Sequence, residues 1–136
     1  MTEEQTTDLT EEIRWAISSE WLAQNSRSEA AIIKDYLCAD CAKKLYEKKA
    51  APTLKMLQSS IQSCCSKDLD FFHEKLPIAE SIFRVFLRNG NKPLNAKDIS
   101  AELGKLRPGD NVYRSLPEIL LNVLKNDCFY GLQQIR

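Results

Sequence analysis

The stretch PIAESIFRVFLRNG, residues 77–90, decides the fold class. Pro77 suits the first turn of a helix, because the first N–H groups of a helix have no partner within it. The apolar residues of this stretch recur at helical spacing and form one side: Ile78, Ile82, Val85, Phe86 and Leu87. Gly90 suits the position just past a helix end, where a left-handed conformation is common. The stretch therefore predicts an amphipathic helix that packs into a core and ends near Gly90.

More elements are predicted after this helix. They are a short strand, two helices and a terminal strand, at residues 92–94, 95–103, 116–125 and 129–132. Asn95 is a good N-cap residue for the first of these two helices, and Gly104 is expected to end it. Cys128 is expected to lie in the terminal strand and to be buried in the core.

The order helix, strand, helix, loop, helix, strand resembles that of the winged helix-turn-helix family. The resemblance covers residues 76–132, about half of the chain. It implies a winged-helix-like module at residues 76–136, with a minimal β ribbon. It also implies DNA binding through the third helix, which would lie in the major groove. Winged helices also serve as protein-interaction modules, because a fold does not fix a function.

Residues 116–125 depart from the pattern of a DNA-reading helix. The stretch LPEILLNVLK has one basic, one acidic and one amide side chain, and six of its ten residues are Leu, Ile or Val. A recognition helix instead exposes hydrogen-bonding side chains to base edges and phosphates. A helix this apolar is expected to pack on two sides or to meet a partner. Lys105, Arg107 and Arg114 are the candidate DNA-contacting residues, and the alternative is a solvated basic surface.

Residues 1–66 are predicted to form a module of three helices that carries a cysteine cluster. In the first helix, Ile13, Ile17 and Trp21 recur every four residues, which is typical of one apolar face. The three helices are expected at residues 10–24, 28–49 and 54–65. Residues 66–75 are interpreted as a linker, so the whole chain is expected to be mainly α.

Five cysteines are present, and four of them form two groups. Cys38 and Cys41 have C-x-x-C spacing, and Cys64 and Cys65 follow after 22 intervening residues. Zinc takes four ligands in a tetrahedron, and a C-x-x-C pair supplies two. Cys64 is expected to continue the apolar face of the third helix and to meet the first pair. The sequence thus predicts a structural zinc site, with His73 as a substitute for Cys65. The alternatives are buried free thiols and redox or iron–sulfur chemistry, with His73 as an ordinary packing or surface residue.

The 136-residue chain has no formal net charge, so it lacks the overall electrostatic footprint of a nucleic-acid-binding protein. Residues 1–73 hold 9 basic and 12 acidic side chains, a balance of −3, whereas residues 74–136 hold 10 and 7, a balance of +3. No apolar run approaches the roughly 18–20 residues that span a bilayer, and the polar start is unlike a secretory signal. We therefore expect a cytoplasmic protein, whose cysteines are reduced thiols or metal ligands.

The sequence contains no catalytic pattern. It has a single histidine and none of the glycine-rich loops that hold phosphates. We therefore expect no enzymatic activity and no small-molecule substrate. The predicted function is that of a small regulatory or adaptor protein, which binds a protein partner or a second copy of itself through apolar helical surfaces. The alternative is a DNA-binding transcription regulator with metal- or redox-responsive cysteines.

Overall fold

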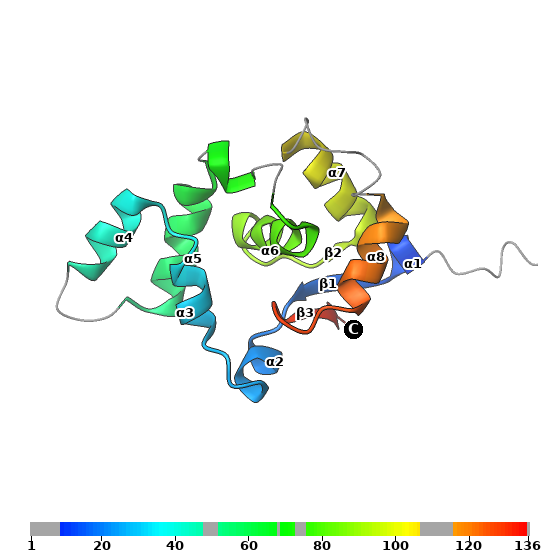
Figure 1. Cartoon of the computed structure of the whole chain (residues 1–136), viewed down its shortest axis with the longest axis horizontal. Helices are drawn as coiled ribbons and strands as arrows, with labels where there is room; N and C mark the ends of the chain where they lie inside the picture. Colours follow the sequence, from blue (N-terminus) through cyan, green and yellow to red (C-terminus); the bar gives the residue numbers. More distant parts are fainter. Residues whose placement is uncertain (1–8, 48–51, 68, 73–75, 107–115, 136) are drawn as a thin grey trace, which may run out of the picture.

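A computed structural model describes residues 9–47, 52–67, 69–72, 76–106 and 116–135. In this part of the chain, Figure 1 shows one group of helices beside a small three-stranded sheet and a second group farther to one side. The elements are helices α1 (Leu9–Glu12), α2 (Ser19–Gln24), α3 (Glu29–Lys34), α4 (Ala39–Tyr46), α5 (Leu54–Ser63), α6 (Ile78–Arg88), α7 (Ala96–Leu106) and α8 (Pro117–Lys125), 3₁₀ turns η2 (Cys65–Lys67) and η3 (Leu69–Phe72), and strands β1 (Arg14–Ile17), β2 (Leu94–Asn95) and β3 (Leu132–Ile135). The expected fold class, mainly α with a minimal β ribbon, is confirmed.

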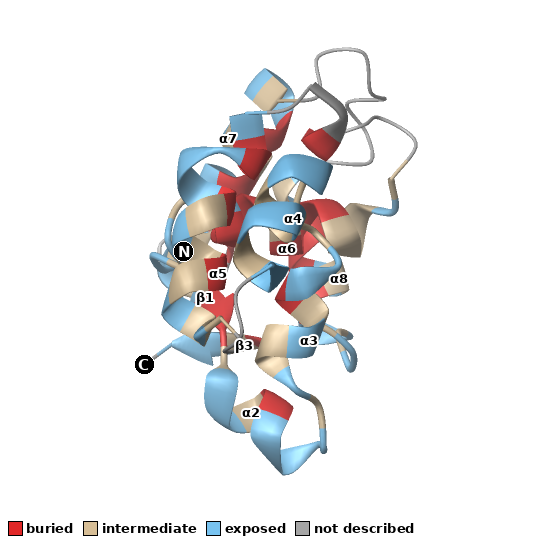
Figure 2. Cartoon of the chain, turned by 90° about the vertical axis from the view of Figure 1, so that its left-hand side faces the viewer, coloured by how far each residue is buried: buried red, intermediate tan, exposed pale blue. Residues whose placement is uncertain are grey.

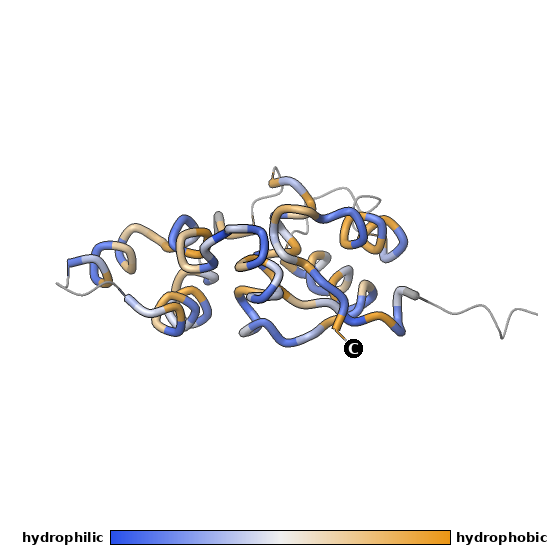
Figure 3. The backbone as a smooth tube through the Cα atoms, turned by 90° about the horizontal axis from the view of Figure 1, so that it is seen from below, coloured by the Kyte–Doolittle hydropathy of each residue, from blue (hydrophilic) through white to orange (hydrophobic). Residues whose placement is uncertain are grey.

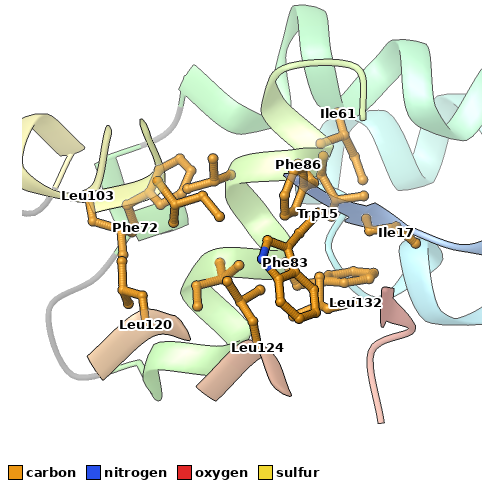
Figure 4. Packing of buried hydrophobic residues seen from close by; sticks show 14 of the residues in the cluster. Trp15, Ile17, Ile61, Phe72, Phe83, Phe86, Leu103, Leu120, Leu124 and Leu132 are labelled. Carbon is orange, nitrogen blue, oxygen red and sulfur yellow. The ribbon is translucent and has the colours of Figure 1, made fainter. Parts of the chain in front are cut away.

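Helix α6 lies at the centre of the core, as its dense apolar side predicts. Ile82, Phe83 and Phe86 are completely buried. The helix contacts α5, α7, α8 and strand β1, and Figure 4 shows Phe83 and Phe86 among buried side chains from these elements. The φ angle of Gly90 is 78°, so the predicted left-handed glycine after the helix is confirmed.

Residues 10–24 do not form the single helix that the four-residue spacing predicts. They form α1, β1 and α2 in succession. Asn91 holds the end of β1, because its Oδ1 accepts the N–H of Ile17 at 2.8 Å and its Nδ2 donates to the Ile17 carbonyl at 2.9 Å. The prediction was wrong because apolar residues fit a strand equally well where distant strands are present to pair with it.

Strand β1 is the central strand of an antiparallel sheet in the order β2-β1-β3. Trp15 pairs with Leu94 of β2 on one side and with Gln134 of β3 on the other. A strand from the first part of the chain therefore completes the sheet of the second part. The buried residues of both parts belong to one hydrophobic cluster.

Strand β3 begins three residues later than predicted, at Leu132 instead of position 129. The carboxylate of Asp127 accepts the N–H groups of Tyr130 at 3.1 Å and of Leu132 at 3.0 Å, which forms a turn before the strand. Gly131 completes this turn with a φ angle of 72°, and a Cβ at this position would come within 2.9 Å of a core side chain. This turn moves the start of the strand later in the sequence, and the pattern of apolar residues gives no sign of it.

Two other expectations about the second half are corrected. Helix α7 continues past Gly104 to Leu106, because a glycine inside a helix costs only about 1 kcal/mol relative to alanine. Cys128 is exposed, because it lies within the turn at Asp127–Gly131 and not in β3.

The helices of the first half are shorter than expected. Helix α3 begins after Ser28, whose Oγ accepts the N–H of Ala31 at 3.2 Å, so the predicted cap is confirmed. The predicted long second helix is broken between Lys34 and Ala39. Helix α3 packs against α5, whereas α4 has no fully buried residue. Figure 1 places α4 at the end of the molecule far from α8, and Figure 2 shows its largely exposed surface.

The expected linker contributes to the core. Phe71 and Phe72 in η3 are buried, with ring centroids 5.1 Å apart. Figure 3 shows hydrophobic and hydrophilic residues alternating along the helices on both sides of this connection, as amphipathic helices require. The two halves are therefore joined by a packed segment. His73 lies outside the described residues.

Candidate metal centre

Cys38 and Cys41 stand at the beginning of α4. Cys38 is the N-cap residue, with an extended backbone (φ −69°, ψ 161°), and Cys41 lies in the first turn. Both side chains are half-buried. The first N–H groups of a helix have no partner within it, and the backbone N–H of Cys41 donates a hydrogen bond to the thiol of Cys38.

Cys64 and Cys65 stand where α5 ends and η2 begins. Cys64 is the C-cap residue of α5, with a non-helical backbone (φ −135°, ψ −65°), and its side chain is exposed. Cys65 is only 2% exposed. The buried face of α5 runs through Leu57 and Ile61 to Cys65 at four-residue intervals. The expectation that Cys64 continues this face was wrong, because the chain leaves the helix at Cys64.

The cysteines of the two segments come together. The Sγ atoms of Cys38, Cys41 and Cys64 all lie within 4.8 Å of one another. With Zn–S bonds of about 2.3 Å, tetrahedral thiolates are about 3.8 Å apart, so these three sulfurs are close enough to hold a metal ion. Cys65 is next to them, because its Sγ accepts the backbone N–H of Cys38 at 3.2 Å and its thiol interacts with those of Cys38 and Cys41.

Three of the clustered thiols, those of Cys38, Cys41 and Cys65, have shifted pKa values. The pKa of Cys38 is lowered, mainly by the hydrogen bond from the backbone N–H of Cys41. The pKa values of Cys41 and Cys65 are raised, mainly because burial disfavours a charged thiolate. A metal ligand must be the thiolate, so a cation that binds here displaces protons from the buried thiols. Metal affinity at this cluster is therefore expected to weaken as the pH falls.

Arg84 of α6 ties both cysteine-bearing segments to the core. Its Nη1 donates to the carbonyl of Phe71 at 3.0 Å, and its Nη2 forms an ion pair with Glu80 at 3.0 Å. Its guanidinium lies over the ring of Tyr36, 4.6 Å from the ring centroid, and over that of Phe71, 5.0 Å away. Tyr36 precedes Cys38 by two residues, and Phe71 follows Cys65 by six. Sequence reasoning missed this contact, because one arginine on a helix carries no signal of its partners.

Of the three candidate DNA-contacting residues, only Lys105 lies in the described part of the chain. Lys105 is exposed, with its Nζ 4.0 Å from the carboxylate of Glu102. Arg88 approaches the same carboxylate at 3.6 Å. Arg107 and Arg114 lie outside the described residues. The one described candidate, Lys105, therefore lies beside an acidic side chain that it shares with Arg88.

The outer side of α8 carries two exposed apolar side chains beside the polar residues Glu118, Asn122 and Lys125. Leu116, just before the helix, is 39% exposed and Ile119 is 43% exposed, while Leu120 and Leu124 on the inner face are buried.

Among the described residues, no helix has the length and apolar character needed to cross a membrane. Comparison of the chain with protein-family models, with curated proteins and with solved structures gives no match.

Proposed function

We propose that this chain is a non-enzymatic regulatory or adaptor protein, in which a structural zinc ion holds α4 against α5. The observation that supports the proposal is the convergence of the cysteine pair at the start of α4 with the pair at the end of α5. Cys38, Cys41, Cys64 and Cys65 are the proposed ligands. A centre with four sulfur ligands is typical of structural zinc, because it leaves no open position for a substrate.

The packing of α4 supports a structural role for the ion. This helix has eight residues and no fully buried side chain. Isolated helices of this length are unstable in water, so a helix of this kind depends on tertiary contacts. Cys41 and Leu45 pack only partly against the core. Coordination through Cys38 and Cys41 would fix α4 where hydrophobic packing is weak.

The outer face of α8 supports an adaptor role. Leu116 and Ile119 lie on this face with Asn122, and all three are exposed. Exposed apolar side chains that lie together on one surface are typical of contacts with a protein. The proposed partner is another protein or a second copy of this chain.

Zinc content tests the proposal. We expect one zinc ion per chain when the protein is purified without chelator, measured by native mass spectrometry and by elemental analysis. Cys41→Ser is expected to lose the ion, because it removes a ligand from the centre. Cys128→Ser is the matched control, since this cysteine is exposed and outside the cluster. A wild-type protein that binds no metal, or a Cys41→Ser variant that keeps the ion, would contradict the proposal.

The alternative function, a DNA-binding transcription regulator with responsive cysteines, is favoured by the order of α6, β2, α7, α8 and β3. It is disfavoured by the exposed apolar side chains of α8 and by the pairing of Lys105 and Arg88 with Glu102. Contacts with phosphates require free basic side chains and make the affinity depend steeply on salt.

Binding to a fluorescent DNA duplex separates the two functions. Non-specific DNA binders typically have Kd values of about 10⁻⁴–10⁻⁶ M at physiological salt, and we expect no tighter binding here by fluorescence anisotropy. We also expect Lys105→Ala to behave like the control Lys55→Ala, which changes an exposed lysine on α5. A Kd well below this range that rises with salt, and that Lys105→Ala alone weakens, would favour the DNA-binding function.

A further inference from the structure

The four clustered thiols differ sharply in their access to solvent. Cys64 is exposed, Cys38 and Cys41 are half-buried, and Cys65 is buried. A shallow surface hollow opens beside the cluster, lined by Cys38, Ala39, Asp40, Cys64 and Lys67. A small dissolved molecule therefore reaches the sulfur of Cys64 without any rearrangement of the core.

The adjacent cysteines have different roles in this geometry. The Sγ of Cys65 is enclosed and accepts the N–H of Cys38. The Sγ of Cys64 faces solvent and lies within 4.8 Å of the Sγ atoms of both Cys38 and Cys41. A disulfide has an S–S distance of about 2.05 Å, so side-chain rotation over less than 3 Å brings Cys64 to either thiol.

We propose that Cys64 is an oxidation site at which hydrogen peroxide releases the metal and frees α4. The inference rests on the proposed zinc centre. The thiolate of Cys64 attacks one oxygen of hydrogen peroxide, the O–O bond breaks, and hydroxide leaves, so that Cys64 becomes a sulfenic acid. A thiolate of the C-x-x-C pair then attacks the sulfur of Cys64, the S–O bond breaks, and a second hydroxide leaves.

The sum of these two steps is balanced. Two thiolates give two electrons to one peroxide molecule, and the products are one disulfide and two hydroxide ions, which take up two protons from the solution. The zinc ion loses two of its four ligands and dissociates. Helix α4 has no fully buried residue and packs only partly against the core, so loss of the ion is expected to free it.

Peptide mapping of the wild-type, zinc-loaded protein tests the order of events. Trypsin places Cys38 and Cys41 in peptide 35–43 and the other pair in peptide 56–67. Under limiting peroxide, we expect release of one zinc ion per peroxide consumed, measured with a chromogenic chelator. We also expect a cross-link between the two peptides that fragmentation assigns to Cys64. Dithiothreitol and zinc are expected to reverse both changes.

Cys64→His supplies a matched variant, because three cysteines and one histidine also form a structural zinc site. We expect this variant to bind zinc, to release it several-fold more slowly under peroxide, and to lose the cross-linked peptide. Cys128, exposed but outside the cluster, is the internal reference thiol, in peptide 126–136.

The outcomes separate this inference from the zinc proposal. If the wild-type protein binds no zinc, the proposed function fails first. If zinc binds but stays bound at peroxide concentrations that oxidise Cys128, the inference alone is wrong. Release of zinc with Cys64 still reduced, for example through a disulfide between Cys38 and Cys41, also overturns it, as does equal release from Cys64→His.

Discussion

Removal of zinc with a chelator is expected to lower the melting temperature by about 10–20 °C and to release α4 from the rest of the chain. At a free zinc concentration 1,000 times the Kd, binding adds about 4 kcal/mol to the free energy of unfolding. For a chain of 136 residues, each kcal/mol changes the melting temperature by roughly 3–5 °C. Calorimetry with and without chelator measures this fall.

Chelation is expected to destabilise α4 in particular, in addition to lowering the stability of the whole chain. Helix α4 has no fully buried residue, whereas α6 has several, including Phe83 and Phe86. Amide hydrogen exchange should therefore become fast at residues 38–46 after chelation and stay slow in α6. Exchange that is equally slow in α4 with and without zinc would show that packing alone holds this helix.

Single substitutions provide the controls for chelation. Cys128→Ser should behave like the wild-type protein, because its side chain is exposed and outside the cluster. Cys41→Ser should melt at the lower temperature and show no further fall with chelator. If chelator lowers the melting temperature of Cys41→Ser as much as that of the wild-type protein, the ion lies elsewhere in the chain.

The sequence predicts which residues form the cysteine cluster, but it does not predict how their side chains are arranged. The C-x-x-C spacing and the second cysteine pair indicate the right segments, and the structure brings Cys38, Cys41 and Cys64 together. Whether Cys64 or Cys65 is buried depends on where α5 ends. One residue of non-helical backbone changes which of the two side chains points into the core. Helix ends are local features that apolar spacing defines only to within one or two residues.

The fold could likewise be predicted where apolar residues recur regularly, but not where contacts between distant parts of the sequence decide the structure. Residues 77–90 predict α6 correctly, because their apolar residues are dense and recur at helical spacing. In contrast, Ile13, Ile17 and Trp21 fit a helix face equally well, yet Ile17 lies in a strand. That choice depends on Leu94 and Gln134, the strand partners of Trp15, which are about 80 and 120 residues away. A spacing rule over a short window does not contain these contacts.

The position of β1 bears on how the chain unfolds. Strand β1 precedes α2 to α5 in the sequence but pairs with strands that follow them. The intervening helices α2 to α5 are therefore inserted, in sequence, between strands of one sheet. One cluster of buried residues includes Ile33 and Leu57 from these helices and Phe83 from α6. This arrangement favours a single cooperative transition over separate unfolding of two modules.

Phe83→Ala is therefore expected to destabilise the whole chain by about 3–5 kcal/mol, the usual cost of removing a buried phenylalanine side chain. Phe83 is completely buried, and its ring centroid is 5.5 Å from that of Tyr36 and 5.1 Å from that of Tyr130. It thus joins the segment before the cysteine cluster to the segment before β3. Urea unfolding, followed by tryptophan fluorescence and by circular dichroism, measures the change.

Tryptophan fluorescence and circular dichroism report on different regions, so a comparison of their unfolding midpoints tests whether the chain unfolds cooperatively. Trp15 and Trp21 are the only tryptophans and lie in β1 and α2, whereas circular dichroism reports on every helix. Phe129→Ala is the control, because Phe129 is 45% exposed and its ring contacts only the guanidinium of Arg27 and the edge of Tyr130 among the ring contacts of the described residues. Each such contact contributes about 0.5–1.5 kcal/mol. If Phe83→Ala leaves too little folded protein, Phe83→Leu provides a milder variant. Equal costs for Phe83→Ala and Phe129→Ala would contradict the central position of α6, and separate midpoints for the two probes would show that the two halves unfold independently.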